Sequence, residues 1–144
     1  MKNLNIIQIY FLLFLLFGCV EKSLSQNCHI RNHLLLRKSI VASLGEDWYK
    51  KFSSERENGF YAKVFTDATG KIIDLDSFGF YGGITKKELK KCFTTLKQKF
   101  QLCVKNPDPH FTFEKYVELN KGKIPYNFRY FPFKVEKMLE RLKK

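Results

Sequence analysis

The cysteines of this sequence could form disulfides, bind metal or react as thiols. Beyond the apolar N-terminal stretch they are Cys28, Cys92 and Cys103. The last two are about 11 residues apart on one predicted helix, hence about 16 Å apart, whereas the Cα atoms of a disulfide lie within about 7 Å. Unless that helix ends early, the available disulfide joins Cys28 with Cys92 or with Cys103, and one thiol is left over. The sequence contains no Cys-x-x-Cys motif that would indicate thioredoxin-like redox chemistry.

A metal site would have to begin from Cys28, His29 and His33. The two histidines lie one helical turn apart on one face, as paired metal ligands often do. A closed site needs at least one more ligand, for which only His110 or a carboxylate is available. A polar helix face at the start of the mature chain explains the same residues more simply. The sequence therefore predicts no metal and no cofactor.

Asp74 and Asp76 are the candidate carboxylate pair for acid–base catalysis. On a predicted strand over Ile72–Phe78 they share one face, about 7 Å apart, opposite Ile73 and Leu75. General acid–base catalysis also needs a cleft and shifted pKa values, and the sequence indicates neither. The sequence contains no nucleophile elbow or other motif that links a serine, a histidine and an acidic residue as a catalytic set. We therefore predict a solvated strand face, no catalytic residues and no enzymatic activity.

The formal net charge of +12 favours anionic partners such as lipid head groups or cell-wall polymers. Nucleic acid is not expected, because the chain looks exported and has no zinc-finger or helix-turn-helix spacing. A capping box at Thr85 begins a helix whose apolar residues share one face. Its lysines lie on a different arc and form the predicted basic face: Lys86, Lys87, Lys90, Lys91 and Lys97. Simple solvation of that face is the alternative.

Residues 1–25 are predicted to be a signal peptide. Ile6–Phe17 is apolar over about the length of a signal-peptide core, and Ser23 and Ser25 place cleavage before Gln26. Two alternatives remain, a lipoprotein whose Cys19 becomes the lipidated first residue, or a retained anchor. Either cleavage implies an exported protein, in the periplasm or membrane-anchored through Cys19.

The remaining sequence predicts alternating helices and strands. Residues 28–56 are helical, as one kinked helix or two helices because Gly45 interrupts the pattern. Strands over Phe60–Thr66 and Ile72–Phe78 follow, joined by a turn in which Gly70 has positive φ. The Thr85 helix ends before Asn106. Partial alternation over His110–Leu119, a turn at residues 120–123, an extended aromatic stretch over Ile124–Val135 and a short C-terminal helix complete the chain.

This order predicts an α+β fold with helices on one face of a small antiparallel sheet. The segments are the leader at 1–25, an N-terminal helical segment at 26–58 and an α+β domain at 59–144. Two prolines indicate that this last extended stretch is an edge strand or the end of a strand. Its aromatic residues are candidates for contacting a peptide, although half of them must line the core: Tyr126, Phe128, Tyr130 and Phe131.

Residues from about 60 to 135 resemble the C-terminal domain of TonB-type proteins. The resemblance rests on the turn Asp67-x-x-Gly70-x-Ile72, the helix over Thr85–Phe100, the turn at 120–123 and Tyr130–Phe133. The chain has only 4 Pro, so it lacks the Pro-rich span of TonB transducers, and it inserts 103–118 before the closing strand.

The resemblance implies a stand-alone periplasmic module that binds an extended peptide at a sheet edge. We therefore predict an exported, non-enzymatic protein-interaction or peptide-interaction module of the bacterial envelope. The alternative function is a basic envelope protein that contacts anionic polymer or lipid through the lysine-rich helix face.

Overall fold

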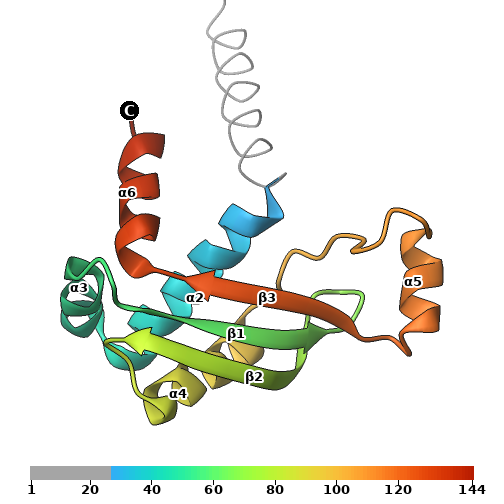
Figure 1. The fold of residues 1–144 in the computed structure, drawn as a ribbon, viewed down its shortest axis with the longest axis horizontal. Helices are drawn as coiled ribbons and strands as arrows, with labels where there is room; N and C mark the ends of the chain where they lie inside the picture. Colours follow the sequence, from blue (N-terminus) through green and yellow to red (C-terminus); the bar gives the residue numbers. More distant parts are fainter. Residues whose placement is uncertain (1–26) are drawn as a thin grey trace, which may run out of the picture.

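The computed structural model describes residues 27–144, so the leader predicted at 1–25 lies outside the described residues. The fold is α+β, as predicted from the sequence. Its elements in chain order are α2 (Cys28–Leu44), α3 (Glu46–Ser54), β1 (Gly59–Thr66), β2 (Ile72–Gly82), α4 (Lys86–Lys99), α5 (Phe113–Leu119), β3 (Ile124–Tyr130) and α6 (Pro132–Leu142) (Figure 1).

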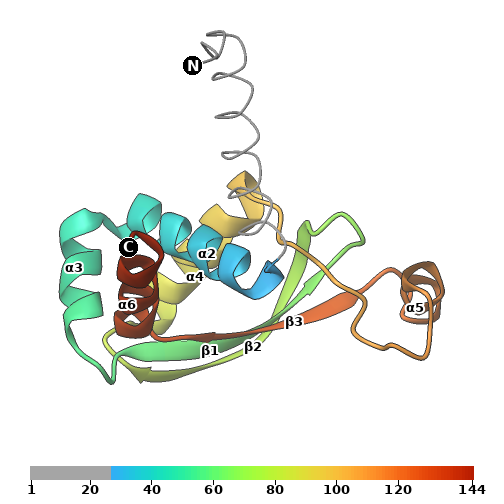
Figure 2. The same cartoon turned by 90° about the horizontal axis from the view of Figure 1, so that it is seen from above.

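The three strands form one antiparallel sheet in the order β2-β1-β3. β1 is central, and from Phe60 onward its even-numbered residues are buried while its odd-numbered ones are more exposed. Figure 2 shows α2, α3, α4 and α6 on the same side of the sheet, with α5 beyond its far end. The sheet therefore has one helix-covered face, and β2 and β3 are its two edges.

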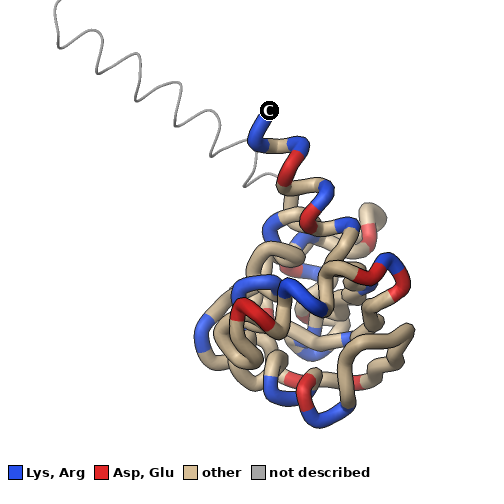
Figure 3. The backbone as a smooth tube through the Cα atoms, turned by 90° about the vertical axis from the view of Figure 1, so that its left-hand side faces the viewer, with Lys and Arg blue, Asp and Glu red and all other residues tan. Residues whose placement is uncertain are grey.

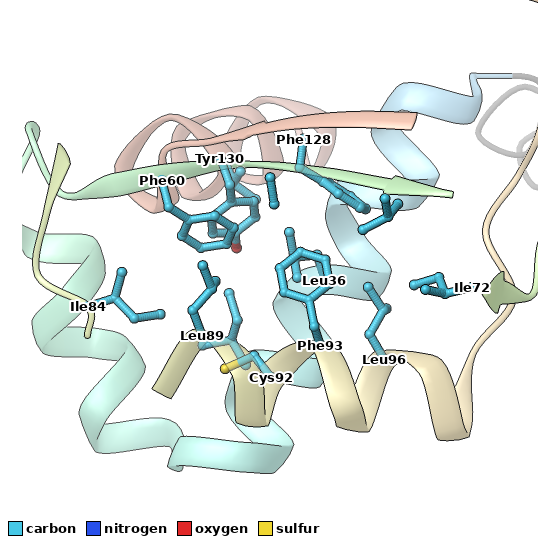
Figure 4. Close-up of a cluster of buried hydrophobic side chains, with 14 of the residues drawn as sticks. Leu36, Phe60, Ile72, Ile84, Leu89, Cys92, Phe93, Leu96, Phe128 and Tyr130 are labelled. Atoms are coloured by element: carbon cyan, nitrogen blue, oxygen red, sulfur yellow. The ribbon is translucent and has the colours of Figure 1, made fainter. Parts of the chain in front are cut away.

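The core lies between the sheet and the helices. Phe60, Phe128 and Tyr130 extend from the strands towards Phe93 and Leu96 of α4 (Figure 4). Side chains of α2 and α3 belong to the same buried cluster, so the helical segment at 26–58 shares one core with the remainder of the fold: Leu36, Ile40, Tyr49 and Phe52. Burial of this shared apolar surface is the main force that holds the helices to the sheet.

Local sequence explains where the helices begin and end. The side chain of Asn27 accepts a hydrogen bond from the Ile30 amide at 3.3 Å and caps α2. Gly45, at φ 96°, lies between α2 and α3, so the segment forms two helices. At α4, Glu88 accepts from the Thr85 amide at 2.8 Å, and the Glu88 amide donates to the Thr85 hydroxyl at 3.2 Å. This confirms the predicted capping box.

The predicted orientation of β2 is wrong at Ile73. Thr66 pairs with Ile72, and the adjacent Phe65 pairs with Asp74, so Ile73 is an extra residue in a β-bulge. Ile73 is consequently 40% exposed, whereas Ile72 is buried. The pairing of β1 with β2 has two further register shifts. β2 also continues to Gly82, beyond the end predicted at Phe78.

The alternation predicted as a strand over His110–Leu119 is instead α5. Thr112 accepts a hydrogen bond from the Lys115 amide at 3.3 Å, which caps a helix. No residue of α5 is buried, and Leu119 is 54% exposed. With no adjacent strand to pair with, local capping decides the conformation of this segment.

The extended stretch predicted over Ile124–Val135 is too long by one helical turn. β3 ends at Tyr130, and α6 begins at Pro132. Proline suits the first turn of a helix because its missing amide hydrogen has no partner there in any case. Val135 is thus a buried helical residue rather than the end of a strand.

Candidate functional site

A disulfide joins Cys28 to Cys103, with 5.1 Å between their Cα atoms. α4 ends at Lys99, so Cys103 lies in the loop after the helix and can reach the start of α2. Cys92 is a buried free thiol on α4, and burial raises its pKa to about 12. Of the two predicted pairings, the structure has the one with Cys103.

Asn32 adds a second connection between α2 and the same loop. Its side chain is fully buried, donates to the carbonyl of Cys103 at 2.8 Å and accepts from the amide of Cys103 at 2.7 Å. Sequence reasoning missed this residue. The available signal was its position one turn after Cys28 and one turn before the buried Leu36, on the core face of the helix.

The first turn of α2 and the disulfide loop lie beside the outer edge of β3. The ring nitrogens of His33 lie 2.9 and 3.2 Å from the carbonyl oxygens of His29 and Arg129, so the imidazole packs against one β3 carbonyl. Pro125 has no amide hydrogen to offer a new strand. The first turn of α2 and the loop at 103–107 line a hollow of about 340 Å³ together with residues 125–127.

The aromatic residues predicted to bind a peptide therefore serve other purposes. Phe128 and Tyr130 are 1% and 0% exposed and form part of the core, so the prediction is wrong for both. Tyr126 is half-buried and packs edge-on against Phe128, with 4.7 Å between ring centroids. Phe131 follows the end of the strand and packs on Tyr81 at 4.9 Å.

β2 and α4 lie side by side (Figure 1) and line a groove at the outer edge of β2. No strand pairs with this edge within residues 27–144. The groove has a volume of about 480 Å³. Its apolar lining comes from both elements: Ile72, Ile73, Leu75 and Phe78 from β2, and Phe93 from α4.

The predicted basic face of α4 divides into two parts. Lys86, Lys90 and Lys97 line the groove, whereas Lys87 and Lys91 do not. The ammonium of Lys97 donates to the carbonyl of Ile73 at 3.0 Å, and that of Lys86 lies 5.7 Å from the ring centroid of Phe78. Basic residues elsewhere are spread along the chain (Figure 3).

The groove lining is electropositive. The carboxylate of Asp74 is the only acidic group among the residues that line it, against three lysines. The other carboxylate considered for catalysis, Asp76, forms an ion pair with Lys63 at 3.3 Å on the opposite side of β1 from the core. The two carboxylates therefore have different neighbours.

The turn between β1 and β2 holds the hairpin against the disulfide loop. Asp67 accepts from the hydroxyl and amide of Thr69 and from the amide of Lys71, and its pKa is lowered chiefly by the Thr69 hydroxyl. Gly70 has the predicted positive φ, 86°, and its carbonyl accepts from the Leu102 amide at 2.8 Å. A side chain on Gly70 would overlap the backbone of Leu102.

The groove can bind an extended ligand through backbone groups, an apolar floor and lysine side chains. Among residues 27–144, no group of three or more His, Cys, Asp or Glu side chains is arranged to hold a metal. None of the helices described is long and apolar enough to cross a membrane. Comparisons with protein-family models, curated proteins and solved structures found no match for this chain.

Proposed function

We propose that the protein is an exported interaction module of the bacterial envelope that binds an extended segment of a partner protein along the β2 edge. The carrying observation is that this unpaired edge faces lysines of α4 across a groove with an apolar floor. An extended peptide that adds to such an edge gains affinity from backbone hydrogen bonds and selectivity from alternate side chains. The role is binding, without catalysis or a cofactor.

The stretch Ser77–Phe80 is best suited to pair with a new strand. Its register with Phe60–Lys63 on β1 is regular, whereas bulges lie on either side of it. Near Ile73 the edge is partly occupied, because Lys97 already donates to that carbonyl. Every second side chain of a bound peptide would face the floor at Leu75 and Phe78, beside Lys86 and Lys90.

Export is supported by the sequence of the leader and by the disulfide. Oxidised cysteine pairs are typical of secreted and periplasmic proteins, and the Cα atoms of Cys28 and Cys103 lie 5.1 Å apart, within the range for a disulfide. The resemblance to TonB C-terminal domains supports the same proposal through the order hairpin, α4 and closing strand β3. Strand addition would here use β2 instead of the strand first expected.

A second candidate function is contact with an anionic polymer or lipid through the same lysines. The electropositive groove lining favours it. The two functions differ in what the ligand must supply, since strand addition needs backbone amides whereas a lysine contact needs only negative charge. Ionic strength weakens the second kind of contact steeply.

A synthetic peptide that alternates Val and Glu tests the proposal by fluorescence anisotropy. Its matched control is the same peptide with N-methyl groups on alternate amides, which keeps the charge but cannot add as a strand. We expect the unmodified peptide to bind at least about tenfold more tightly than the methylated one, because main-chain hydrogen bonds carry this mode of recognition. Equal affinities would reject strand addition in favour of the polymer contact.

The lysines provide a second control on the same helix. Lys86→Glu with Lys90→Glu reverses two charges in the groove, and Lys87→Glu with Lys91→Glu makes the same change outside it. The groove variant should lose at least about tenfold in affinity, and the outer variant less than about threefold. Equal losses would place the peptide elsewhere or show that only net charge matters.

A further inference from the structure

The C-terminal helix α6 carries an excess of basic charge that the fold does not neutralise. Its acidic residues are both paired, Glu136 with Arg37 at 2.5 Å and Glu140 with Lys137 at 3.1 Å. The remaining basic residues of the helix and the two after it have no acidic partner within the described part of the chain: Lys134, Arg141, Lys143 and Lys144. Figure 3 shows basic residues near the free end of this helix.

An apolar flank lies beside these cations. Val135 is buried and holds the first turn of α6 to the core, but Leu142 in the last turn is 51% exposed. Phe133, Met138 and Leu142 line a hollow of about 570 Å³ that they share with Lys134, Lys137 and Arg141. The last turns of α6 extend beyond the body of the molecule (Figures 1 and 3). One side of the helix is thus both apolar and basic.

The same side of the molecule is where the described chain begins. His29 and Ile30 in the first turn of α2 line a hollow of about 160 Å³ together with Lys134 and Met138 of α6. The segment that precedes Asn27 contains the apolar stretch Ile6–Phe17 and Cys19. About eight residues join Cys19 to Asn27, and they span at most about 28 Å when extended.

We propose that α6 is a membrane-surface contact that binds a bilayer rich in anionic lipid. The exposed side chain of Leu142 enters the head-group region, while Met138 packs against the core, and the unpaired cations bind lipid phosphates. Basic amphipathic helices bind membrane surfaces through these two contributions together. A lipid or apolar anchor at the N-terminus holds a protein stably when a basic surface supplies a second contact, and the described chain begins beside α6. This contact is independent of the β2 groove.

Flotation of the purified mature protein with vesicles tests the proposal. The probes are phosphatidylcholine vesicles with and without phosphatidylglycerol. We expect binding to the anionic vesicles and at least about tenfold weaker binding by the triple variant Arg141→Glu, Lys143→Glu, Lys144→Glu. The matched control, Lys87→Glu, Lys91→Glu, Lys99→Glu on α4, changes net charge equally and should lose less than about threefold.

Two leucine variants distinguish insertion of an apolar side chain into the bilayer from binding by charge alone. Leu142→Ser should weaken vesicle binding by at least about threefold, whereas Leu119→Ser, on the equally exposed α5 leucine, should not change it. The proposal would be overturned if the two charge variants lost binding equally or if the two leucine variants bound equally well. It would also be overturned if the parent did not bind to anionic vesicles. Equal loss of binding to vesicles and to soluble polyglutamate would overturn it as well, because it would indicate a general polyanion contact.

Discussion

The two edges of one three-stranded sheet have different surroundings. Along β3, residues distant in sequence cover the strand: the first turn of α2, the disulfide loop and the ring of His33. Along β2, the neighbouring element is α4, which leaves a groove and contributes lysines to it. Both strands are edge strands by topology, and they differ in the elements that lie beside them.

The difference shows that the availability of an edge depends on what packs beside it and not on strand composition alone. β3 has the higher proportion of aromatic residues, and it buries Phe128 and Tyr130. β2 contains bulges and has Lys97 at one carbonyl, both of which reduce uncontrolled pairing of exposed edges. A site that binds by strand addition needs an edge that resists uncontrolled pairing and that no other element of the fold blocks.

Removing the disulfide should have the largest effect, because it releases the cover of β3. The double variant Cys28→Ala, Cys103→Ala should lose about 2–5 kcal/mol in free energy of unfolding, measured in urea. Reductant should destabilise the parent by a similar amount and leave the variant unchanged. A parent that is insensitive to reductant would show that the cross-link does not stabilise this edge.

Asn32→Ala should have the next largest effect. The change leaves the amide and carbonyl of Cys103 without their hydrogen-bond partner beside a buried helix face. We expect a loss of about 1–3 kcal/mol in free energy of unfolding. Asn127→Ala, at an exposed position of β3, is the control and should change it by less than about 0.5 kcal/mol. Similar values for the two variants would contradict the assigned role of Asn32.

Alkaline pH should loosen the β3 end of the sheet. The hydroxyls of Tyr49 and Tyr130 lie 2.8 Å apart, and burial raises the pKa of both side chains above the ordinary value. Since the fold favours the neutral phenols, their stabilisation is complete below about pH 10 and is lost as the pH rises further.

The double variant Tyr49→Phe, Tyr130→Phe should therefore show a shallower fall in melting temperature between about pH 9 and about pH 11. Tyr61→Phe changes an exposed phenol and should keep the slope of the parent. If all three proteins have the same slope, these phenols do not titrate with unfolding.

Lys97→Ala should have the smallest effect on stability and a visible effect on association. The side chain is exposed, so the free energy of unfolding should change by less than about 0.5 kcal/mol. Its loss frees the Ile73 carbonyl at the β2 edge, so the variant should self-associate at lower protein concentration in sedimentation experiments. Lys91→Ala, outside the groove, should sediment as the parent does.

Local patterns predicted much of the fold because their causes are local. The Thr85 capping box, the positive φ of Gly70 and the break at Gly45 all follow from a few adjacent residues. Ile73 was misplaced because a bulge depends on the register with β1, which the sequence of β2 does not contain. α5 was mistaken for a strand because its alternating residues have no strand to pair with.

The candidate site depended even more on distant residues. The lysines of α4 were predicted as a basic face, but their division between groove and solvent depends on how α4 packs beside β2. β3 was favoured as the binding edge because aromatic content was taken as a sign of binding. The disulfide at Cys103 and the hydrogen bonds of Asn32 hold α2 and the loop after α4 together beside β3. These segments are far from β3 in the sequence, so their packing could not be inferred from β3 itself.

Amide hydrogen exchange on the saturated complex with the Val–Glu peptide distinguishes the two edges most directly. Strand addition at β2 should slow exchange within Ser77–Phe80 and leave the amides of β3 unchanged, because a new strand protects the edge to which it bonds. Slower exchange within Ile124–Tyr130, with β2 unaffected, would contradict the assignment of the open edge to β2.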